Sequence, residues 1–270
     1  MVVTLEQIIA AVRKRLEEAK TRVPLSEIAA QAEAVTRAPR GFRQAVESAP
    51  GGIAVIAELK KASPAAGPLR GSFHVGMLAS QLEKGGASAL SVLTEEEYFG
   101  GSLGDLNEAA AACGLPCLRR DFIVDEYQLY QARLFHADAV TLMMTALSEI
   151  EFKALYSRAR DLQLEVVCEV HDEPEMEMAA EFGVEIISVN CRDVQTLELD
   201  SRLHVEMAKL LPTSVLRIAE SGVTSSASMR KLKVLGYQGF LIGESLMKAE
   251  DAGAALAQLL AEARAPAVSA

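Results

Sequence analysis

The sequence predicts an α/β protein, a closed (β/α)₈ TIM barrel with an N-terminal helical extension. Eight short and nearly continuous apolar runs alternate with amphipathic segments along the chain, as expected for buried parallel strands joined by helices. Several amphipathic segments end in a glycine just before the next run, at Gly183 and Gly236 for example, and glycine is common where helices stop. An open, doubly wound sheet is the alternative on pattern alone.

The elements follow one another in a regular order. Two segments of helical pattern, 5–20 and 26–35, open the chain. The predicted strands are 53–59, 89–94, 115–122, 139–146, 164–170, 185–190, 215–221 and 239–243. The clearest helical segments among them are 77–85, 129–136, 152–162, 174–183, 229–236 and 252–263. We expect a single barrel domain over residues 1–270, with residues 1–48 forming the extension.

Composition limits the class of protein. Half of the residues are hydrophobic and 24% are charged, which is typical of a soluble protein with a large core. No stretch reaches the roughly 18 apolar residues of a membrane span, and the charged opening segment is unlike a signal peptide. We therefore expect a cytoplasmic protein with no membrane partner. The net charge of -10 argues against a nucleic-acid partner, so an anionic ligand would be held by a few local basic groups.

The cysteines and histidines give no sign of a metal site. Cys113, Cys117, Cys168 and Cys191 form no C-x-x-C pair, and three of them lie in or beside apolar runs. The four histidines form no H-x-x-x-H pattern. We expect reduced thiols and no metal ligands.

Polar residues stand at the ends of the predicted strands, where barrels of this kind carry their chemistry. Glu58 and Lys60 are two residues apart, so their side chains share one face of the first strand and Lys61 takes the other. The further candidates are Thr94, Glu95, Arg120, Asp121, Thr145, Glu169, His171, Asn190, Arg192, Glu220, Ser221, Gly222, Gly243, Glu244 and Ser245. Any one of them could be polar because it meets water, but charges that converge from six strands favour a site.

The last two strands end in sequences that favour an anion. AESGV, 219–223, and LIGESLM, 241–247, each place a glycine and a hydroxyl where a strand turns into a helix. Free backbone N–H groups and the helix dipole attract phosphate at such turns, and these two loops of a barrel are a recurrent phosphate site. One such glycine could be a plain turn residue, but two predict a phosphorylated small-molecule substrate.

Seven stretches together resemble those of the indole-3-glycerol-phosphate synthase family in order and spacing. They are AELKKASPAAG, SVLTEEEYFGGSLGDL, RRDFIVDEYQLYQA, CEVHDEPE, SVNCRDVQTLELD, IAESGV and LIGESLM. The resemblance runs from the N-terminal helices to about Ala263, and the combination is far more specific than any one motif. It implies a barrel of the ribulose-phosphate-binding type that uses no cofactor and no metal.

The resemblance also implies a reaction and its residues. Members of the family are carboxy-lyases of tryptophan biosynthesis. They convert 1-(o-carboxyphenylamino)-1-deoxyribulose 5-phosphate to indole-3-glycerol phosphate, with loss of carbon dioxide and water. By resemblance, Lys60 contacts substrate anions and acts as an acid in dehydration, paired with Glu58. Glu169 is the second catalytic carboxylate, and Asn190 orients it. Residues that match the substrate pocket are Ser63, Pro64, Phe99, Arg192 and Ser221, and those that match the phosphate loops are Gly222, Gly243 and Glu244. Ordinary core packing explains Pro64 and Phe99 equally well.

One position departs from the family pattern. Where the resemblance implies a lysine before Asp-Phe on the third strand, as the general acid for ring closure, this chain has Arg120. Arginine keeps the charge, but its pKa above about 12 makes it a poor proton donor. We therefore expect Arg120 to stabilise the oxyanion while Lys60 or a water molecule supplies the proton. Reduced activity and a different substrate are the alternatives.

Three functions are compatible with these residues. The first is a working synthase, as a monomer or a weak homodimer. The second is another ribulose-phosphate barrel enzyme such as phosphoribosylanthranilate isomerase, which would carry a cysteine where the first strand ends in Glu58 and Lys60. The third is a catalytically weakened or silent paralogue that binds a related phosphorylated ligand, and only Arg120 favours it.

Overall fold

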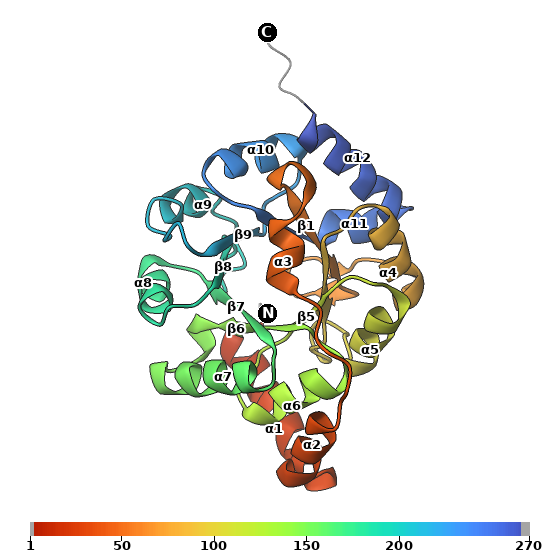
Figure 1. The fold of residues 1–270 in the computed structure, drawn as a ribbon, viewed down its shortest axis with the longest axis vertical. Coiled ribbons are helices and arrows are strands. Elements are labelled where there is room, and N and C mark those ends of the chain that lie inside the picture. Colours follow the sequence, from red (N-terminus) through yellow and green to blue (C-terminus); the bar gives the residue numbers. More distant parts are fainter. Residues whose placement is uncertain (1–2, 266–270) are drawn as a thin grey trace.

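The strands close into one parallel barrel. A computed structural model, which describes residues 3–265, places the strands around the barrel in the order β1, β10, β9, β8, β7, β6, β5 and β4, and β4 pairs with β1. Their bounds are β1 Ala54–Leu59, β4 Ala89–Leu93, β5 Cys117–Arg120, β6 Ala139–Met143, β7 Glu165–Val170, β8 Ile186–Asn190, β9 Leu216–Glu220 and β10 Gly239–Ile242. Helices surround the strands (Figure 1). The predicted closed barrel is confirmed and the open sheet is wrong. Residues 1–2 and 266–270 of the predicted domain lie outside the described residues.

The helices follow the strands, and most of them begin at a residue whose side chain caps the helix. They are α4 Val75–Lys84, α5 Leu103–Ala112, α6 Glu126–Leu134, α7 Glu149–Asp161, α8 Glu173–Glu181, α9 Arg202–Met207, α10 Ser226–Val234, α11 Glu244–Lys248 and α12 Ala252–Arg264. Ser148 and Ser225 form capping boxes that satisfy free N–H groups of α7 and α10. Past the ends of α8 and α10, Gly183 and Gly236 have φ of +66° and +94°, which glycine adopts at little cost. Within residues 3–265, no helix combines the length and the apolar character that crossing a membrane requires.

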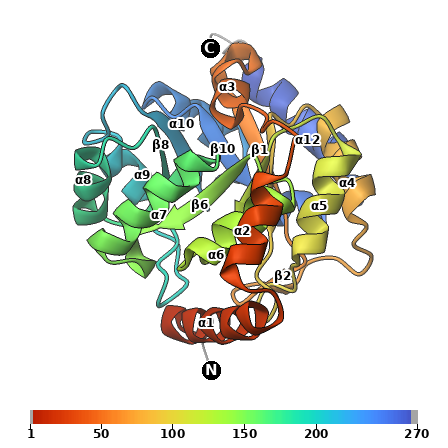
Figure 2. The ribbon, with the colours of Figure 1, turned by 60° about the horizontal axis from the view of Figure 1, so that its bottom comes forward.

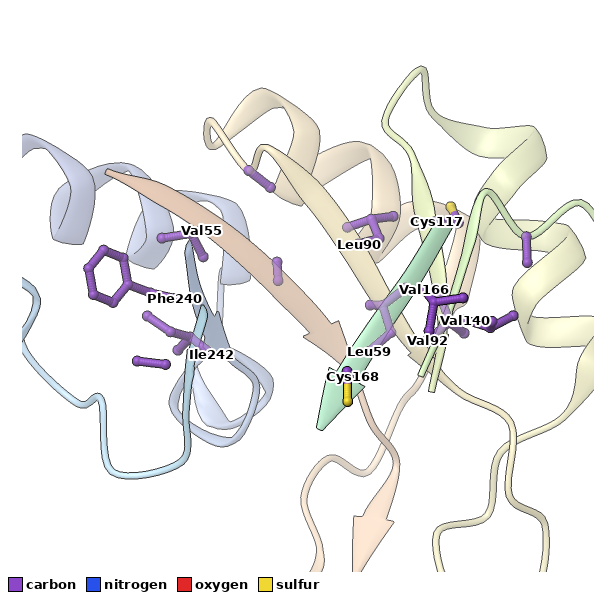
Figure 3. Packing of buried hydrophobic residues seen from close by; sticks show 14 of the residues in the cluster. Val55, Leu59, Leu90, Val92, Cys117, Val140, Val166, Cys168, Phe240 and Ile242 are labelled. Carbon is purple, nitrogen blue, oxygen red and sulfur yellow. The ribbon is translucent and has the colours of Figure 1, made fainter. Parts of the chain in front are cut away.

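Successive strand residues alternate between the barrel interior and the helical layer. On β1, Ile56 belongs to the interior cluster of apolar residues, whereas Val55 and Leu59 pack beneath the helices. Figure 3 shows part of that outer layer, with labelled side chains from Val55, Leu59, Leu90, Val92, Cys117, Val140, Val166, Cys168, Phe240 and Ile242. A residue two positions after Ile56, such as Glu58, therefore points into the barrel.

The N-terminal segment packs against both ends of the barrel. Helix α3, Phe42–Glu47, adds Phe42 and Val46 to the interior cluster at the end where the strands begin. Helix α1, Leu5–Arg22, and helix α2, Leu25–Glu33, form an apolar cluster with α6 and with residues that follow β5 and β6. Figure 2 shows α1 across the opposite end of the molecule from α3. One segment thus seals the closed end and covers the open one.

Several short elements differ from the predicted pattern. The loop after β1 contains a two-stranded antiparallel hairpin, β2 Ala62–Ser63 and β3 Gly67–Pro68. The predicted strand 139–146 ends at Met143, because Met144–Ala146 forms the 3₁₀ helix η2. The 3₁₀ helix η1, Pro50–Gly52, and the helices α3, α9 and α11 have six residues or fewer. Elements this short show no periodicity that a sequence pattern could reveal.

We expect Phe42→Ala to lower the free energy of unfolding by about 3 to 5 kcal/mol, because a fully buried ring would leave a cavity beneath a rigid barrel. Urea unfolding followed by circular dichroism measures the loss. Val234→Ala on α10 is the control, since Val234 is 87% exposed and should change the stability by less than about 0.5 kcal/mol. A loss at Phe42 as small as that of the control would show that α3 does not support the core.

Candidate active site

A cavity of about 770 Å³ opens where the strands end, next to α1. Its size is typical of small-molecule sites, and its place is that of active sites in such barrels. All the predicted site residues line it, namely Glu58, Lys60, Ser63, Pro64, Phe99, Arg120, Glu169, Asn190, Arg192, Ser221, Gly222, Gly243 and Glu244. The cavity thus gathers residues from segments that are far apart in the sequence.

The alternation of strand residues that places apolar side chains inside the barrel also makes the charged side chains point into it. Glu58, Arg120, Glu169 and Glu220 each lie two residues after an interior apolar residue of the same strand, and Asn190 lies four after Ile186. Each is the last inward position of its strand. The barrel interior is therefore apolar along most of the strands and charged at the end where the strands finish.

The guanidinium of Arg120 lies at the centre of the charged groups. Its Nη2 donates to Glu169 Oε1 at 3.0 Å and lies 2.8 Å from Glu220 Oε2, and its Nη1 also donates to Glu169. Its Nε is 4.0 Å from Glu58 Oε1. Burial lowers the pKa of Arg120, but the neighbouring carboxylates outweigh burial and raise the pKa above its ordinary value. Arg120 therefore stays charged and keeps its proton.

Glu169 is contacted from three sides. Besides Arg120, Asn190 Nδ2 donates to its Oε1 at 2.7 Å, and His171 Nε2 lies 3.3 Å from the same oxygen. Burial raises the pKa of Glu169, but the charge of Arg120 and the contact with His171 outweigh it and hold that pKa well below its usual range. Glu169 is thus ionised at neutral pH and able to accept a proton.

His171 lies behind Glu169 and does not line the cavity. Its Nδ1 is 3.4 Å from Glu175 Oε2 and 3.1 Å from Thr145 Oγ1. Burial lowers the pKa of His171, but its contacts with Glu169 and Glu175 raise it to about 10. The imidazolium is a second positive charge beside Glu169. His171 is one of the strand-end candidates, and the sequence alone gives it no role.

Three strand-end candidates to which the family resemblance gives no role also line the cavity, namely Asp121, Glu220 and Ser245, and Glu220 is the one that contacts Arg120. Its side chain is 2% exposed, and Ser188 Oγ donates to its Oε1 at 2.6 Å. Burial raises the pKa of Glu220, the charge of Arg120 opposes this effect, and the nearby Glu169 adds to it, so that the pKa reaches about 7. Because Glu169 has three partners that favour its ionised form, Glu220 is the carboxyl group that carries a proton near neutrality. Its spacing from Ile218 could have identified it.

Glu58 and Lys60 meet as the strand alternation predicts. Lys60 Nζ donates to Glu58 Oε2, and both side chains line the cavity. Lys61 points away and pairs with Asp105 of α5 at 2.8 and 3.0 Å. The cavity therefore gains one ammonium group beside a carboxylate.

Asn190 is oriented by its neighbours. Ser221 Oγ donates to Asn190 Oδ1 at 2.7 Å, and the backbone N–H of Arg192 donates to the same oxygen at 3.1 Å. The amide nitrogen is then left to donate to Glu169. Ser221 has a φ of +59°, in the left-handed region that is costly for residues other than glycine. The site thus holds local backbone strain.

The loops after β9 and β10 form the end of the cavity predicted to bind phosphate. Gly222 has a φ of +65° and Gly243 precedes the first turn of α11. A Cβ at Gly243 would lie 2.9 Å from Glu58 Cβ and 3.1 Å from its carboxyl carbon. Glycine is therefore required there by the position of the Glu58 side chain. Glu244 pairs with Lys248 at 2.5 Å, and both line the cavity.

The cavity wall towards α1 is apolar. Phe99 and Pro64 line it together with Leu5 and Ile8 of α1. The rings of Phe99 and Phe122 have centroids 6.0 Å apart. Such a wall suits the flat face of an aromatic ligand.

Four strand-end candidates, Thr94, Glu95, Thr145 and His171, do not line the cavity. Thr94 Oγ1 donates to Asp121 Oδ2 at 2.6 Å, and Arg119 Nη2 donates to the same oxygen at 2.8 Å. Glu95 pairs with Arg15 of α1. In the part of the chain from residue 3 to 265, no group of three His, Cys, Asp or Glu residues is arranged to hold a metal ion.

Solved structures with low sequence identity share this fold. One is KGPDC from Streptococcus mutans, with a TM-score of 0.57 and 11% identity, covering 78% of this chain and 97% of that one. Another is the tryptophan synthase a2b2 complex from Pyrococcus furiosus, with a TM-score of 0.57 and 12% identity over 78% of this chain and 97% of that one. At these identities they show the fold alone.

Closer similarity comes from curated relatives. The indole-3-glycerol phosphate synthase of Koribacter versatilis is 42% identical over 258 residues, 95% of this chain and 98% of the relative. That of Carboxydothermus hydrogenoformans is 40% identical over 262 residues, 95% of this chain and 99% of the relative. The family model described as "Indole-3-glycerol phosphate synthase" matches residues 5–259. Because the family model covers most of the chain and these relatives are about 40% identical over nearly its full length, the chain belongs to the indole-3-glycerol phosphate synthase family.

Proposed function

We propose that the cavity binds 1-(o-carboxyphenylamino)-1-deoxyribulose 5-phosphate and converts it to indole-3-glycerol phosphate in tryptophan biosynthesis. Membership of the family makes the chain a carboxy-lyase of this kind. The observation that carries the mechanistic proposal is the group of three carboxyl side chains around Arg120, with Lys60 beside them. Such a group can both stabilise developing charge and move protons.

We propose that the two ends of the cavity bind different parts of the substrate. The loops with Gly222 and Gly243 would receive the phosphate, since backbone N–H groups at strand-to-helix turns favour anions. The apolar wall with Phe99 would pack against the carboxyphenyl ring. Lys60 and Arg192 line the cavity and would balance the anionic groups. The ketone would then lie near Arg120.

In the ring-closing step, the aromatic carbon that bears the carboxylate attacks the ketone carbon, and the carbonyl electrons move to oxygen. Arg120 stabilises the charge that develops there. Glu220 gives its proton to that oxygen and becomes a carboxylate, which Arg120 balances. Charge stabilisation and proton donation are therefore divided between two residues, and Glu220 takes the role that was expected of Lys60 or a water molecule.

Decarboxylation and dehydration complete the reaction. Carbon dioxide leaves and its bonding electrons return to the ring. Lys60 protonates the departing hydroxyl group, and Glu169 removes a proton from the carbon next to nitrogen, which forms the indole double bond. Two protons are given and one is recovered, so the cycle takes one proton from solvent.

We further propose a cytoplasmic enzyme that acts as a monomer or a weak homodimer and binds no nucleic acid. The net charge of -10 supports the last point. Light scattering across a range of protein concentrations tests the oligomeric state.

Fluorescence of the indole product, formed from the carboxyphenylamino substrate by the native protein, tests the proposed activity. Steady turnover supports it. Tight binding of the substrate without product would instead identify a silent paralogue.

We expect Glu169→Gln to lower kcat by about 10² or more, because the amide keeps the size of the side chain and cannot accept the proton. KM should change little, and both constants come from the fluorescence assay. Glu149→Gln, on the exposed face of α7, is the matched control and should behave as the native protein. Near-native turnover of Glu169→Gln would remove this residue from the mechanism.

The role of Arg120 is tested by a pair of substitutions. Arg120→Lys keeps the charge and introduces a titratable donor, so kcat should equal or exceed the native value. Arg120→Met should lose about 10² to 10³ in kcat, the scale of one oxyanion-stabilising donor. A methionine variant as fast as the native protein would show that Arg120 takes no part.

The activity should depend on pH through Glu220. Because Glu220 has a raised pKa of about 7 and acts in its protonated form, kcat/KM should fall as the pH rises through about 7. Glu220→Gln should be slow at every pH and should lose this fall, whereas Glu149→Gln should keep it. If the fall persists in Glu220→Gln, another group donates the proton, and Lys60 is the next to test.

A further inference from the structure

Glu95 is a buried carboxylate outside the cavity lining. Its side chain has no exposed surface, and a charge in that position requires close partners. The backbone N–H groups of Glu97, Tyr98 and Phe99 donate to it at 3.0, 2.7 and 3.1 Å. The residue therefore holds the loop after β4 in a tight turn that ends at Phe99, which lines the cavity.

The charged partner of Glu95 comes from α1. Arg15 Nη2 pairs with Glu95 Oε1, and Arg15 Nη1 lies 3.3 Å from Glu97 Oε2 of the same loop. Arg15 lies seven residues, or about two helical turns, after Ile8, so both point to the same side of the helix. One carboxylate thus binds the cavity loop and the helix that covers the cavity.

The other ion pairs between α1 and the barrel are more exposed. Lys20 and Asp125 are each 29% exposed in their side chains, and Arg13 and Glu151, 3.7 Å apart, are 54% and 44% exposed. Exposed pairs of this kind contribute little. Among the described residues, the Arg15–Glu95 pair is the one between α1 and the barrel that has a fully buried partner.

We propose that Glu95 is a positioning residue for the aromatic part of the substrate. By holding Phe99 on one side and, through Arg15, Leu5 and Ile8 of α1 on the other, it fixes the apolar wall of the cavity. The inference rests on the proposed function, because that function supplies the carboxyphenyl ring that the wall would meet. The side chains of Arg15 and Glu95 form their hydrogen bonds and ion pairs with each other and with residues 97–99, and not with the phosphate loops or the side chains around Arg120. Affinity for the ring should therefore depend on the pair, while the chemistry should not.

The test compares Arg15→Met with Arg13→Met in the full-length protein. Arg15→Met should raise KM for the carboxyphenylamino substrate by about tenfold, the effect of a modest loss of binding energy, with kcat within about twofold of native. Inhibition by inorganic phosphate should keep its native constant in Arg15→Met, because phosphate alone does not meet the apolar wall. Arg13→Met should match the native protein in all three quantities.

Several outcomes would overturn the inference. They are an unchanged KM in folded Arg15→Met, equal weakening of substrate and phosphate binding, and a loss confined to kcat. Circular dichroism and thermal melting establish that the variants fold. If Arg15→Met does not fold, Arg15→Lys keeps the charge with fewer donors and should raise KM in the same direction by a smaller factor; an unchanged KM in that variant rejects the inference. Turnover by the native protein tests the proposed function separately.

Discussion

The sharing of one guanidinium by two buried carboxyl groups is the constraint on which the rest of the site depends. Arg120 contacts Glu169 and Glu220 together, and the side chains of both carboxyl groups are almost fully buried. One positive charge does not balance two negative ones at such short range, so the groups around them decide which carboxyl ionises. Asn190 and His171 favour the ionised form of Glu169, and Glu220 is left to hold a proton. The cluster thereby separates a base from an acid.

The alternation of strand residues explains why so much of this site could be predicted from the sequence. In a closed barrel, each strand has one inward series, and its last member must stand at the open end. Glu58, Arg120, Glu169 and Glu220 all obey this rule. The family motifs give Glu220 no role, although its spacing is the same. A prediction made from strand alternation alone would have included it.

The parts that escaped prediction depend on contacts between distant segments. No local pattern relates Arg15 to Glu95, which are 80 residues apart, or His171 to Thr145. Glu95 shows the difficulty well: as a polar residue at a strand end it resembled a site residue, yet its carboxylate turns to α1 and to its own loop. The spacing of residues in the sequence predicts the face of a helix or strand on which a side chain lies. Which residue that side chain contacts is set by the tertiary packing.

Arg120 stands where the family resemblance implies a lysine, and this difference affects how the carboxyl groups around it are held. A lysine presents a compact ammonium that can give up a proton, whereas arginine presents a planar fork that can hold two carboxyl groups and keeps its proton. The fork contacts both Glu169 and Glu220, and that contact keeps the acidic group beside the guanidinium. On the proposed mechanism, the proton that Arg120 cannot supply is thus held by Glu220, which contacts it. On this mechanism, the barrel therefore keeps an acid of a different kind, the buried carboxyl group of Glu220, whose protonation is set by its crowded neighbours.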